Sequence, residues 1–219
     1  MALIAFVALN AHAADALPTV DLSAEGSVTA ANDLARADAY VEASADDPAT
    51  VARQVNRAIA SALERAKRVE GVSVKTTGTS TWPIYAKDSR TISGWRMRSN
   101  LQLESTDIAA LSRLIAELQS TLAIGNLQLM PAPQTLRAAN DAAIRDALRA
   151  FEARAKLVAE ALGRRHRLKA MSIHTQGGPA PVFRARMMAD MSAAPTPAPI
   201  EAGDSTVVVQ VNGTIELID

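Results

Sequence analysis

The most regular pattern of apolar residues in the chain runs from residue 138 to residue 162. Apolar positions return there every three or four residues, which places them on one face of an α-helix with 3.6 residues per turn. The positions on this face are Ile144, Leu148, Phe151, Ala155, Val158 and Leu162. Alanine combines high helix propensity with a small side chain, so we expect this helix to pack closely against other elements. A candidate surface for contact with another subunit is its charged opposite face, formed by Arg145, Arg149, Lys156 and Glu160.

The same periodicity predicts two further helices. Asp47 and Pro48 suit the N-cap and the first helical position, because proline lacks only an N–H that the first turn leaves unpaired. The apolar face that follows consists of Val51, Val55, Ile59, Ala62, Ala66 and Val69. Gly71 suits the left-handed C′ position that ends this helix. The other helix spans residues 106–122, and the Gly-Asn pair at 125–126 is expected to stop it.

Alternation of apolar and polar residues predicts strands in the rest of the chain. The strand ranges are residues 20–29, 35–43, 72–82, 95–104, 127–136, 168–175 and 207–217. Asn32 and Asp33 supply a turn that would join the first two strands as a hairpin, whereas the connection 83–94 is long for one. Pro131 and Pro133 make the fifth of these strands an edge or irregular strand, since proline cannot donate to a sheet ladder.

These elements follow one another in the order ββαββαβαββ, which predicts an α+β fold with long helices packed on a mixed or antiparallel sheet. The order contains two βαββ-like units, residues 34–104 and 127–217, which we expect to share a sheet and a core. A single domain over residues 14–219 is favoured, and it is long enough to bury a substantial core. Residues 176–204 are rich in glycine, proline, alanine and methionine and are predicted to form a long flexible loop.

Residues 1–13 have the pattern of a cleaved signal peptide. An apolar run over residues 2–9 is followed by the small-x-small tripeptide Ala-His-Ala at 11–13. This pattern predicts export and cleavage after Ala13, which would place the mature chain in the periplasm. A transmembrane helix needs about 20 apolar residues, so the run is too short for one and we expect no transmembrane segment in the mature chain. The alternative interpretation is a buried N-terminal strand.

The composition narrows the function classes. The chain is 48% hydrophobic but only 3% aromatic, which indicates a core of small and branched side chains suited to close packing of helix on sheet. Lysine plus arginine equals aspartate plus glutamate at 23 each, so we expect no general attraction to polyanions and no nucleic-acid partner. The chain has no cysteine, which excludes disulfides, thiolate metal sites and cysteine nucleophiles.

The sequence predicts no catalytic, metal-binding or cofactor-binding residues. His166 and His174 are the histidines left after signal cleavage, and a metal site would need more ligands nearby. No HExxH, P-loop or GxSxG motif occurs. Glu25 precedes Gly26 inside a strand, where glycine marks a bulge or the close approach of a neighbour. We favour that interpretation over a catalytic glutamate, because the pattern names no acid or base partner for it.

The basic cluster from Arg164 to Lys169 follows the 138–162 helix. It would suit phosphate or an acidic surface, but we favour a capping role, because positive charge at a helix C-terminus offsets the helix dipole. The 176–204 segment also contains a methionine cluster, Met187, Met188 and Met191, interleaved with Phe183, Arg184 and Arg186. Methionine clusters suit adaptable contacts or sacrificial oxidation. The alternative is a loop that folds over an apolar edge of the same chain.

Several short segments, in their order along the chain, resemble the SIMPL-domain family. They are Ala24-Glu25-Gly26, Trp82-Pro83-Ile84-Tyr85, Ile92-Ser93-Gly94-Trp95, the helix ending at 155–163 and the segment 199–204 before a valine-rich strand. The family is a group of mostly bacterial exported proteins that includes the periplasmic immunogenic proteins. The resemblance implies an exported α+β protein without known catalytic residues. It also implies links to oxidative-stress tolerance and to self-assembly into larger rings.

We therefore predict a non-enzymatic periplasmic protein that acts by binding or self-assembly in the cell envelope, with oxidative-stress tolerance as one setting. A homo-oligomer and an envelope protein partner are the expected associations, and no cofactor is expected. Two alternatives stay open. One is an envelope enzyme with an unrecognised site, which would need polar groups converging in a pocket. The other is a carrier of small apolar ligands beneath the methionine cluster.

Overall fold

The computed structural model describes residues 17–87, 90–175, 180–182 and 202–219. This part of the chain contains three helices and two four-stranded sheets, so the predicted α+β class is confirmed. In chain order the elements are β1 (Thr19–Ala31), β2 (Leu34–Ala45), α1 (Pro48–Lys67), β3 (Val72–Tyr85), β4 (Ile92–Ser105), α2 (Ile108–Leu118), β5 (Ala123–Met130), α3 (Pro133–Ala161), β6 (Arg165–Thr175), β7 (Ala180–Val182) and β8 (Asp204–Ile218).

The observed order differs from the predicted one by a single element. The short strand β7 pairs with the start of β8 and lies inside segment 176–204, for which the sequence predicts a loop without strands. The rest of that segment up to residue 201 lies outside the described residues, as does the predicted signal peptide 1–13. The flexibility of the segment and the cleavage site therefore stay predictions.

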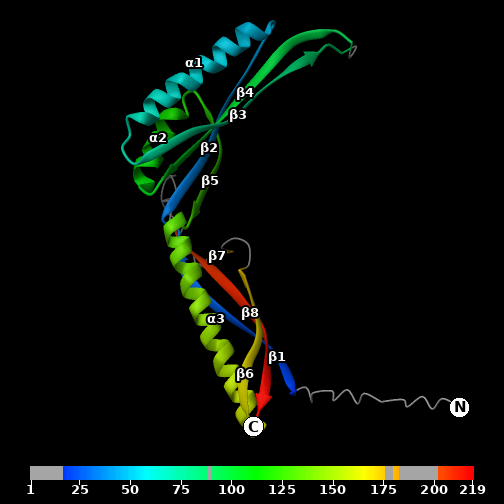
Figure 1. Cartoon of the computed structure of the whole chain (residues 1–219). Coiled ribbons are helices and arrows are strands. Elements are labelled where there is room, and N and C mark those ends of the chain that lie inside the picture. The colour runs from blue at the N-terminus through cyan, green and yellow to red at the C-terminus, as the bar shows by residue number, and fades with distance from the viewer. Residues whose placement is uncertain (1–16, 88–89, 176–179, 183–201) are drawn as a thin grey trace, which may run out of the picture. The chain divides into compact units, whose positions relative to one another are not determined.

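The chain divides into two compact units (Figure 1). Unit 1 consists of Met1–Ser27, Asp141–Gln176 and Val208–Asp219, and unit 2 of Val28–Asn140 and Gly177–Val207. Each unit thus combines segments that are distant in the sequence. A single domain over residues 14–219 stays a prediction.

The two βαββ-like copies share a sheet only through β5, which corrects the predicted arrangement of one common sheet. The first copy supplies β2, α1, β3 and β4, all in unit 2, and β5 from the second copy pairs with β2 in that same sheet. The strands β6 and β8 of the second copy form the other sheet together with β1. Alternation along the chain locates strands but does not say which strands pair. The pattern therefore did not predict that β5 joins the sheet of the first copy or that β1 joins the sheet of β6 and β8.

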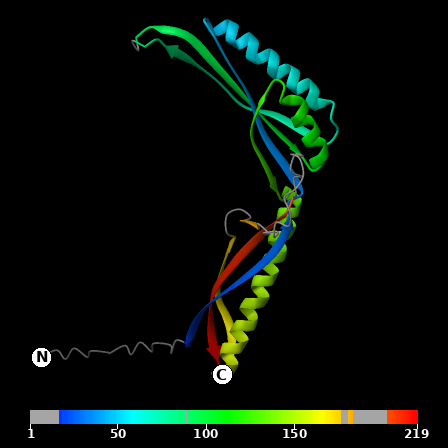
Figure 2. The same ribbon diagram turned by 180° about the vertical axis from the view of Figure 1, so that it is seen from behind.

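The sheet of unit 2 has the strand order β3-β4-β2-β5 with antiparallel pairs, and α1 and α2 cover one face of it (Figure 2). Alternate residues of the two central strands point toward the helices. The buried ones are Ala35, Ala37, Ala39, Met97, Leu101 and Leu103. From the helices they meet Val51, Val55 and Ile59 of α1 and Leu111, Leu114 and Leu118 of α2. Alanines on β2 leave room for the larger side chains opposite them.

The predicted start of α1 is confirmed. The Asp47 carboxylate accepts a hydrogen bond from Thr50 N–H at 2.9 Å, and Pro48 is the first helical residue. Five of the six positions of the predicted apolar face are buried, and the exception is Val69. Gly71 has the expected left-handed φ of 76°, but it lies beyond the C-cap residue Arg68 and not at the C′ position.

The helix α2 is shorter than the sequence predicts. The Asp107 carboxylate accepts a hydrogen bond from Ala110 N–H at 2.8 Å, and the helix ends at Leu118. Gly125 and Asn126 do not stop it, because both lie in β5, where the glycine is the extra residue of a β-bulge opposite β2. The strand β5 is an edge strand as predicted, although it ends before the two prolines.

The hairpin of β3 and β4 is longer than predicted. Its ladder continues to the pair Tyr85 and Ile92, so half of the predicted connection 83–94 is strand. The neighbouring strand β2 pairs with β4 only up to Trp95. Beyond that residue the hairpin is a two-stranded ribbon, which Figure 1 and Figure 2 show reaching past the helices of unit 2.

The first two strands do not form a hairpin, because β1 belongs to the sheet of β8 and β6, whereas β2 lies between β4 and β5. Asn32, predicted as a turn residue, instead holds the start of β8. Its side-chain amide donates to Ala202 O at 3.0 Å and accepts from the Ser205 hydroxyl at 2.7 Å. Its backbone N–H donates to Gly203 O at 3.2 Å. The Asn32 side chain is buried, so these bonds satisfy groups that water does not reach.

The next residue, Asp33, caps the first turn of α3. Its carboxylate accepts hydrogen bonds from Ala132 N–H at 2.6 Å and from the Thr135 hydroxyl at 2.5 Å. Burial alone would raise the pKa of Asp33, but the hydrogen bonds from Ala132 and Thr135 outweigh it and hold the pKa below its ordinary value. The helix dipole also favours a carboxylate at this end.

The sheet of unit 1 has β8 between β1 and β6, and α3 covers one face of it. The buried face of α3 overlaps the predicted one only at Phe151 and Ala155. Its deeply buried residues are four apart and are Ala139, Ala143, Ala147, Phe151, Ala155 and Ala159. Of the larger residues predicted to face the core, Ile144, Leu148 and Val158 are half-buried and Leu162 is exposed. The alanines lie against the sheet because the helix and the sheet approach too closely for larger side chains.

Gly26 of β1 is the point of that close approach. A Cβ atom on Gly26 would lie 2.2 Å from Ala147 N and 2.4 Å from Ala143 O, both backbone atoms of α3. The predicted role of this glycine, a close approach by a neighbouring element, is therefore confirmed.

Candidate functional site

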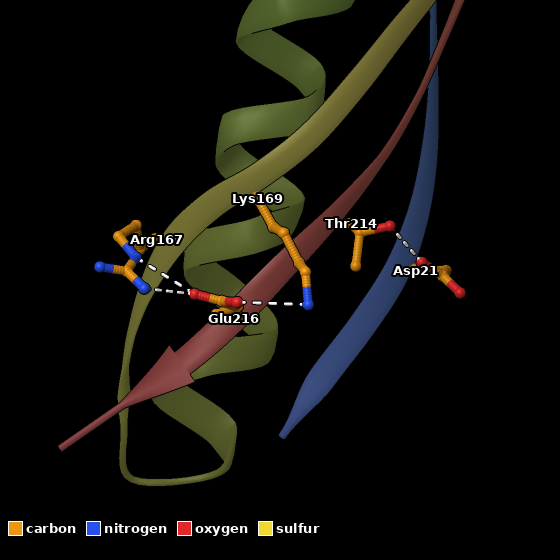
Figure 3. A network of polar contacts seen from close by, with 5 residues as sticks. All are labelled: Asp21, Arg167, Lys169, Thr214 and Glu216. Carbon is orange, nitrogen blue, oxygen red and sulfur yellow. Dashed lines mark hydrogen bonds and ion pairs between the residues drawn. The ribbon is translucent and has the colours of Figure 1, made fainter. Parts of the chain in front are cut away.

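The face of the unit 1 sheet that α3 leaves uncovered is polar. Buried and outward residues alternate along its strands. The outward residues are Asp21, Ser23 and Glu25 on β1, Gln210, Asn212, Thr214 and Glu216 on β8, and Arg167, Lys169, Ser172 and His174 on β6. We call this surface the polar face of unit 1. Figure 3 shows five of its side chains.

Three charged side chains form a network on this face (Figure 3). The Arg167 guanidinium lies 2.5 Å from one Glu216 carboxylate oxygen, and Lys169 Nζ lies 3.3 Å from the other. Hydrogen bonds from Arg167 and then Lys169 hold the pKa of Glu216 below its ordinary value. A carboxylate stabilised in its ionised form is a poor proton donor near neutral pH. The network therefore has the character of a cross-strand ion-pair cluster.

A shallow hollow of about 510 Å³ lies beside this network. Its lining consists of Asp21, Leu22, Ser23, Ala170, Met171, Ser172, Asn212, Gly213 and Thr214. The Thr214 hydroxyl donates to Asp21 Oδ1 at 2.5 Å, and the Gln210 amide donates to Asn212 Oδ1 at 3.4 Å. The lining residues include no histidine, lysine or cysteine that would activate one of the hydroxyls as a nucleophile.

The residues weighed as candidate acids and bases do not converge. Glu25 and His174 lie on the polar face of unit 1, but on its two outer strands with β8 between them. Two strand spacings separate them by about 10 Å. His166 points to the opposite side, where its Nε2 lies 3.1 Å from Glu152 of α3. The structure thus brings together none of these three side chains.

The basic cluster from Arg164 to Lys169 forms ion pairs and does not cap α3. Arg164 lies 3.6 Å from the Asp219 carboxylate, and Arg165 donates to the carbonyl of the same residue. The last turn of α3 contains no basic residue and ends in backbone bonds, with Gly163 at φ 65° and Arg164 N–H donating to Ala159 O at 2.9 Å. This is a Schellman motif, so backbone groups and not these side chains bond the carbonyls at the end of α3. An offset of the helix dipole by the positive charges stays a prediction.

Four other sequence predictions concern metal ligands, the methionine cluster, transmembrane helices and the charged face of α3. Among the described residues, no group of three or more histidine, cysteine or acidic side chains is placed to hold a metal ion. The methionine cluster at 187–191 lies outside the described residues. None of the helices in the described ranges combines the length and apolar character that a membrane crossing needs. On the charged face of α3, Lys156 pairs with Glu160 at 3.8 Å and Arg149 with Asp146 at 3.2 Å.

The features that sequence reasoning missed are exposed large apolar side chains on edge strands. At the end of the β3–β4 hairpin, Trp82 is 37% exposed, Tyr85 56% and Ile92 46%. On β6, Leu168 is 51% exposed and Ile173 44%. Alternation predicts that such residues are core positions. Only the strand order shows that β3 and β6 are edge strands.

Together these observations define a class of protein: a two-sheet α+β protein with a polar open face on its unit 1 sheet and, in its described part, no assembled reactive cluster. The chain belongs to the SIMPL family, described as a protein of unknown function (DUF541), whose model matches residues 20–215. No curated protein matches the chain.

Solved structures resemble parts of the chain only weakly. The de novo designed protein Foldit4 has a TM-score of 0.29 at 13% identity, covering 45% of this chain and 98% of that one. A putative amidohydrolase/peptidase from Burkholderia cenocepacia has a TM-score of 0.28 at 14% identity, over 56% of this chain and 33% of that one. AtUAH in complex with glyoxylate gives 0.30 at 10% identity, over 52% and 31%. The chain spans about a third of the length of these last two structures.

Proposed function

We propose that this protein is an exported, non-enzymatic member of the SIMPL family that acts in the cell envelope by self-assembly, with oxidative-stress tolerance as its setting. The observation that carries the proposal is the open edge of β6. We define this edge as residues 170–175, the part of β6 beyond its bulge at Lys169.

The open edge of β6 leaves apolar side chains half covered. Ile173 is paired with Val211, and Leu168, just before the edge, is paired with Ile215. Directly opposed residues of two strands share a face, so both side chains lie on the side that α3 covers. Their partners on β8 are fully buried, whereas Leu168 and Ile173 stay half exposed. An additional strand beside β6 would bury them.

The backbone of this edge is also suited to pairing. No described strand pairs with the outer side of β6. Residues 170–175 contain no charged residue and no proline, which are the devices that natural edge strands use against pairing. The first half of β6, in contrast, carries Arg165 and Arg167 and a bulge. A second copy of the chain supplies the same edge, so two copies can pair across a two-fold axis.

The first test of this proposal is the mass of the mature chain in solution. We expect light scattering after size-exclusion chromatography to show a dimer or larger assembly at micromolar concentration. Ile173→Lys places a charge on the open edge and should shift the protein to a monomer that remains folded. The matched control is Gln210→Lys, which places the same charge on the polar face but on the central strand β8, and it should keep the wild-type mass.

Two outcomes would contradict self-assembly through β6. One is a wild-type chain that stays monomeric throughout the micromolar range. The other is an assembly whose mass Ile173→Lys and Gln210→Lys leave equally unchanged.

Export is tested separately. If residues 1–13 are a signal peptide, intact mass spectrometry of the protein from a periplasmic fraction should show a chain that begins at Ala14. A cytoplasmic protein that retains Met1 would contradict this part of the proposal. Because the measurement is a mass, it does not depend on the assembly state.

A further inference from the structure

The end of the β3–β4 hairpin is built differently from the rest of unit 2. We define the hairpin end as residues 82–85 of β3, Ala86 and Lys87 directly after it, and residues 92–94 of β4. Only these two strands continue here, because β2 pairs with β4 no further than Trp95. Three large side chains, Trp82, Tyr85 and Ile92, are between a third and three-fifths exposed.

These side chains lie on both faces of the ribbon. Trp82 is paired with Arg96, on the face opposite to the buried Met97 and the partly buried Trp95. Tyr85 lies three positions further along β3, so it points to the other face and stands beside its partner Ile92. A docking patch for a folded protein would gather on one face, whereas apolar groups on both faces suit a ribbon surrounded by a fluid phase.

The exposed area is also small for a protein partner. A buried aromatic residue covers about 150–250 Å², so three half-exposed side chains offer roughly 300 Å². A stable protein interface needs about 800 Å² on each partner. Partition into a lipid surface has no such minimum, because each apolar side chain contributes separately to the transfer out of water.

The charges around the hairpin end favour an anionic surface. Residues 82–94 include two basic residues and one acidic residue, and Arg96 and Arg98 follow on β4. Lys87 is exposed in the connection, and Arg96, 3.7 Å from Glu42, stands next to Trp82 on the hairpin. Tryptophan and tyrosine prefer the membrane–water interface, where the ring meets the acyl boundary and its polar group stays wet. Basic side chains beside them reach lipid phosphates.

We propose that the hairpin end binds the surface of a phospholipid bilayer, with Trp82, Tyr85 and Ile92 at the acyl boundary and Lys87 among the headgroups. The ribbon stays at the interface, because its unpaired strand edges would not be satisfied in the hydrocarbon core. This surface is distinct from the open edge of β6 and does not depend on assembly through it.

The test uses the mature chain with vesicles of phosphatidylcholine and phosphatidylglycerol. A Trp95→Phe variant leaves Trp82 as the single tryptophan, and its emission should shift to shorter wavelength with vesicles and be quenched by brominated lipid. In co-sedimentation, Trp82→Ala and Tyr85→Ala should each lower the partition coefficient on the order of tenfold. The matched control is Leu157→Ala, which removes an exposed leucine of α3 and should leave partitioning unchanged.

Three results would overturn this inference. The first is no sedimentation of the wild-type chain with these vesicles. The second is partitioning that the Trp82→Ala and Leu157→Ala variants leave equally strong. The third is a wild-type assembly, measured without lipid, that Trp82→Ala converts to monomer, because the hairpin end would then bind a second copy of the chain.

Discussion

At the scale of single residues, Asn32 and Asp33 are adjacent in the sequence, yet each forms hydrogen bonds to a different, remote segment of the chain. The Asn32 amide binds the backbone before β8, 170 positions away in the sequence, and Asp33 caps α3. Each residue type was suited to a turn, and an Asn-Asp pair between two alternating segments predicts one. The side-chain bonds go instead to backbone groups that lack other partners. No local pattern in the sequence shows where those groups lie.

We predict that Asp33→Ala destabilises the protein by about 1–3 kcal/mol at neutral pH, because it leaves the Ala132 N–H without its acceptor and removes the cap of α3. Urea unfolding measures this difference. Asp46→Ala is the matched control, since Asp46 is exposed and precedes a helix that Asp47 already caps. Equal unfolding free energies for wild type and Asp33→Ala would contradict the capping role.

The same variant has a defined pH dependence. The folded-state pKa of Asp33 lies below its unfolded value, so the unfolded state binds more protons and stability rises with pH. The contribution of Asp33 is complete above the unfolded pKa of about 3.9 and is lost as the pH falls through the folded pKa. We therefore expect the difference between wild type and Asp33→Ala to shrink in acid. A difference in stability that grows on acidification would contradict a lowered folded-state pKa of Asp33.

At the scale of elements, α3 shows what periodicity can and cannot locate. The spacing of its apolar residues predicts the helix and Phe151 on its buried face. The face itself is displaced, because Ala143 and Ala147 pack against Gly26 and the larger Ile144 and Leu148 flank the contact. Hydrophobicity ranks leucine above alanine, whereas here the distance between helix and sheet decides which is buried.

We predict that Gly26→Ala costs about 2 kcal/mol or more in unfolding free energy, because the new methyl group meets backbone atoms of α3 that have no rotamer to change. Gly78→Ala is the matched control. Gly78 also lies in a strand, and a Cβ atom there has nothing within 4 Å, so the change should stay within about 0.5 kcal/mol. Chemical denaturation of both variants would decide, and a tolerated Gly26→Ala would mean that α3 can shift away from the sheet.

Strand positions were the most predictable part of the fold, and strand pairing the least. The alternation in β1, β2, β4 and β8 gives their ranges to within a few residues. The pairing of β5 with β2, and of β1 with β8, depends on contacts between residues far apart in the chain. The candidate surfaces follow from pairing, since Ile173 and Trp82 are unusual only because β6 and β3 are edge strands. For this reason the sequence pattern gave neither surface.

At the scale of the whole molecule, each unit draws on distant parts of the chain, and the proposed activities use different units. Self-assembly concerns the edge of β6 in unit 1, whereas the lipid contact concerns the hairpin end in unit 2. The two sets of variants should therefore act independently. A protein that assembles through one unit and touches a bilayer through the other would gain membrane affinity by multivalency as copies are added.

The pairing of β1 with β8 also bears on biosynthesis. The first strand of the sheet leaves the ribosome long before the last one, so β1 waits without its hydrogen-bonding partner while most of the chain is made. Closing contacts of such high sequence separation slows folding, and a strand that waits alone is prone to aggregation. For the export across a membrane that we propose, which requires an extended chain, this delay would be an advantage.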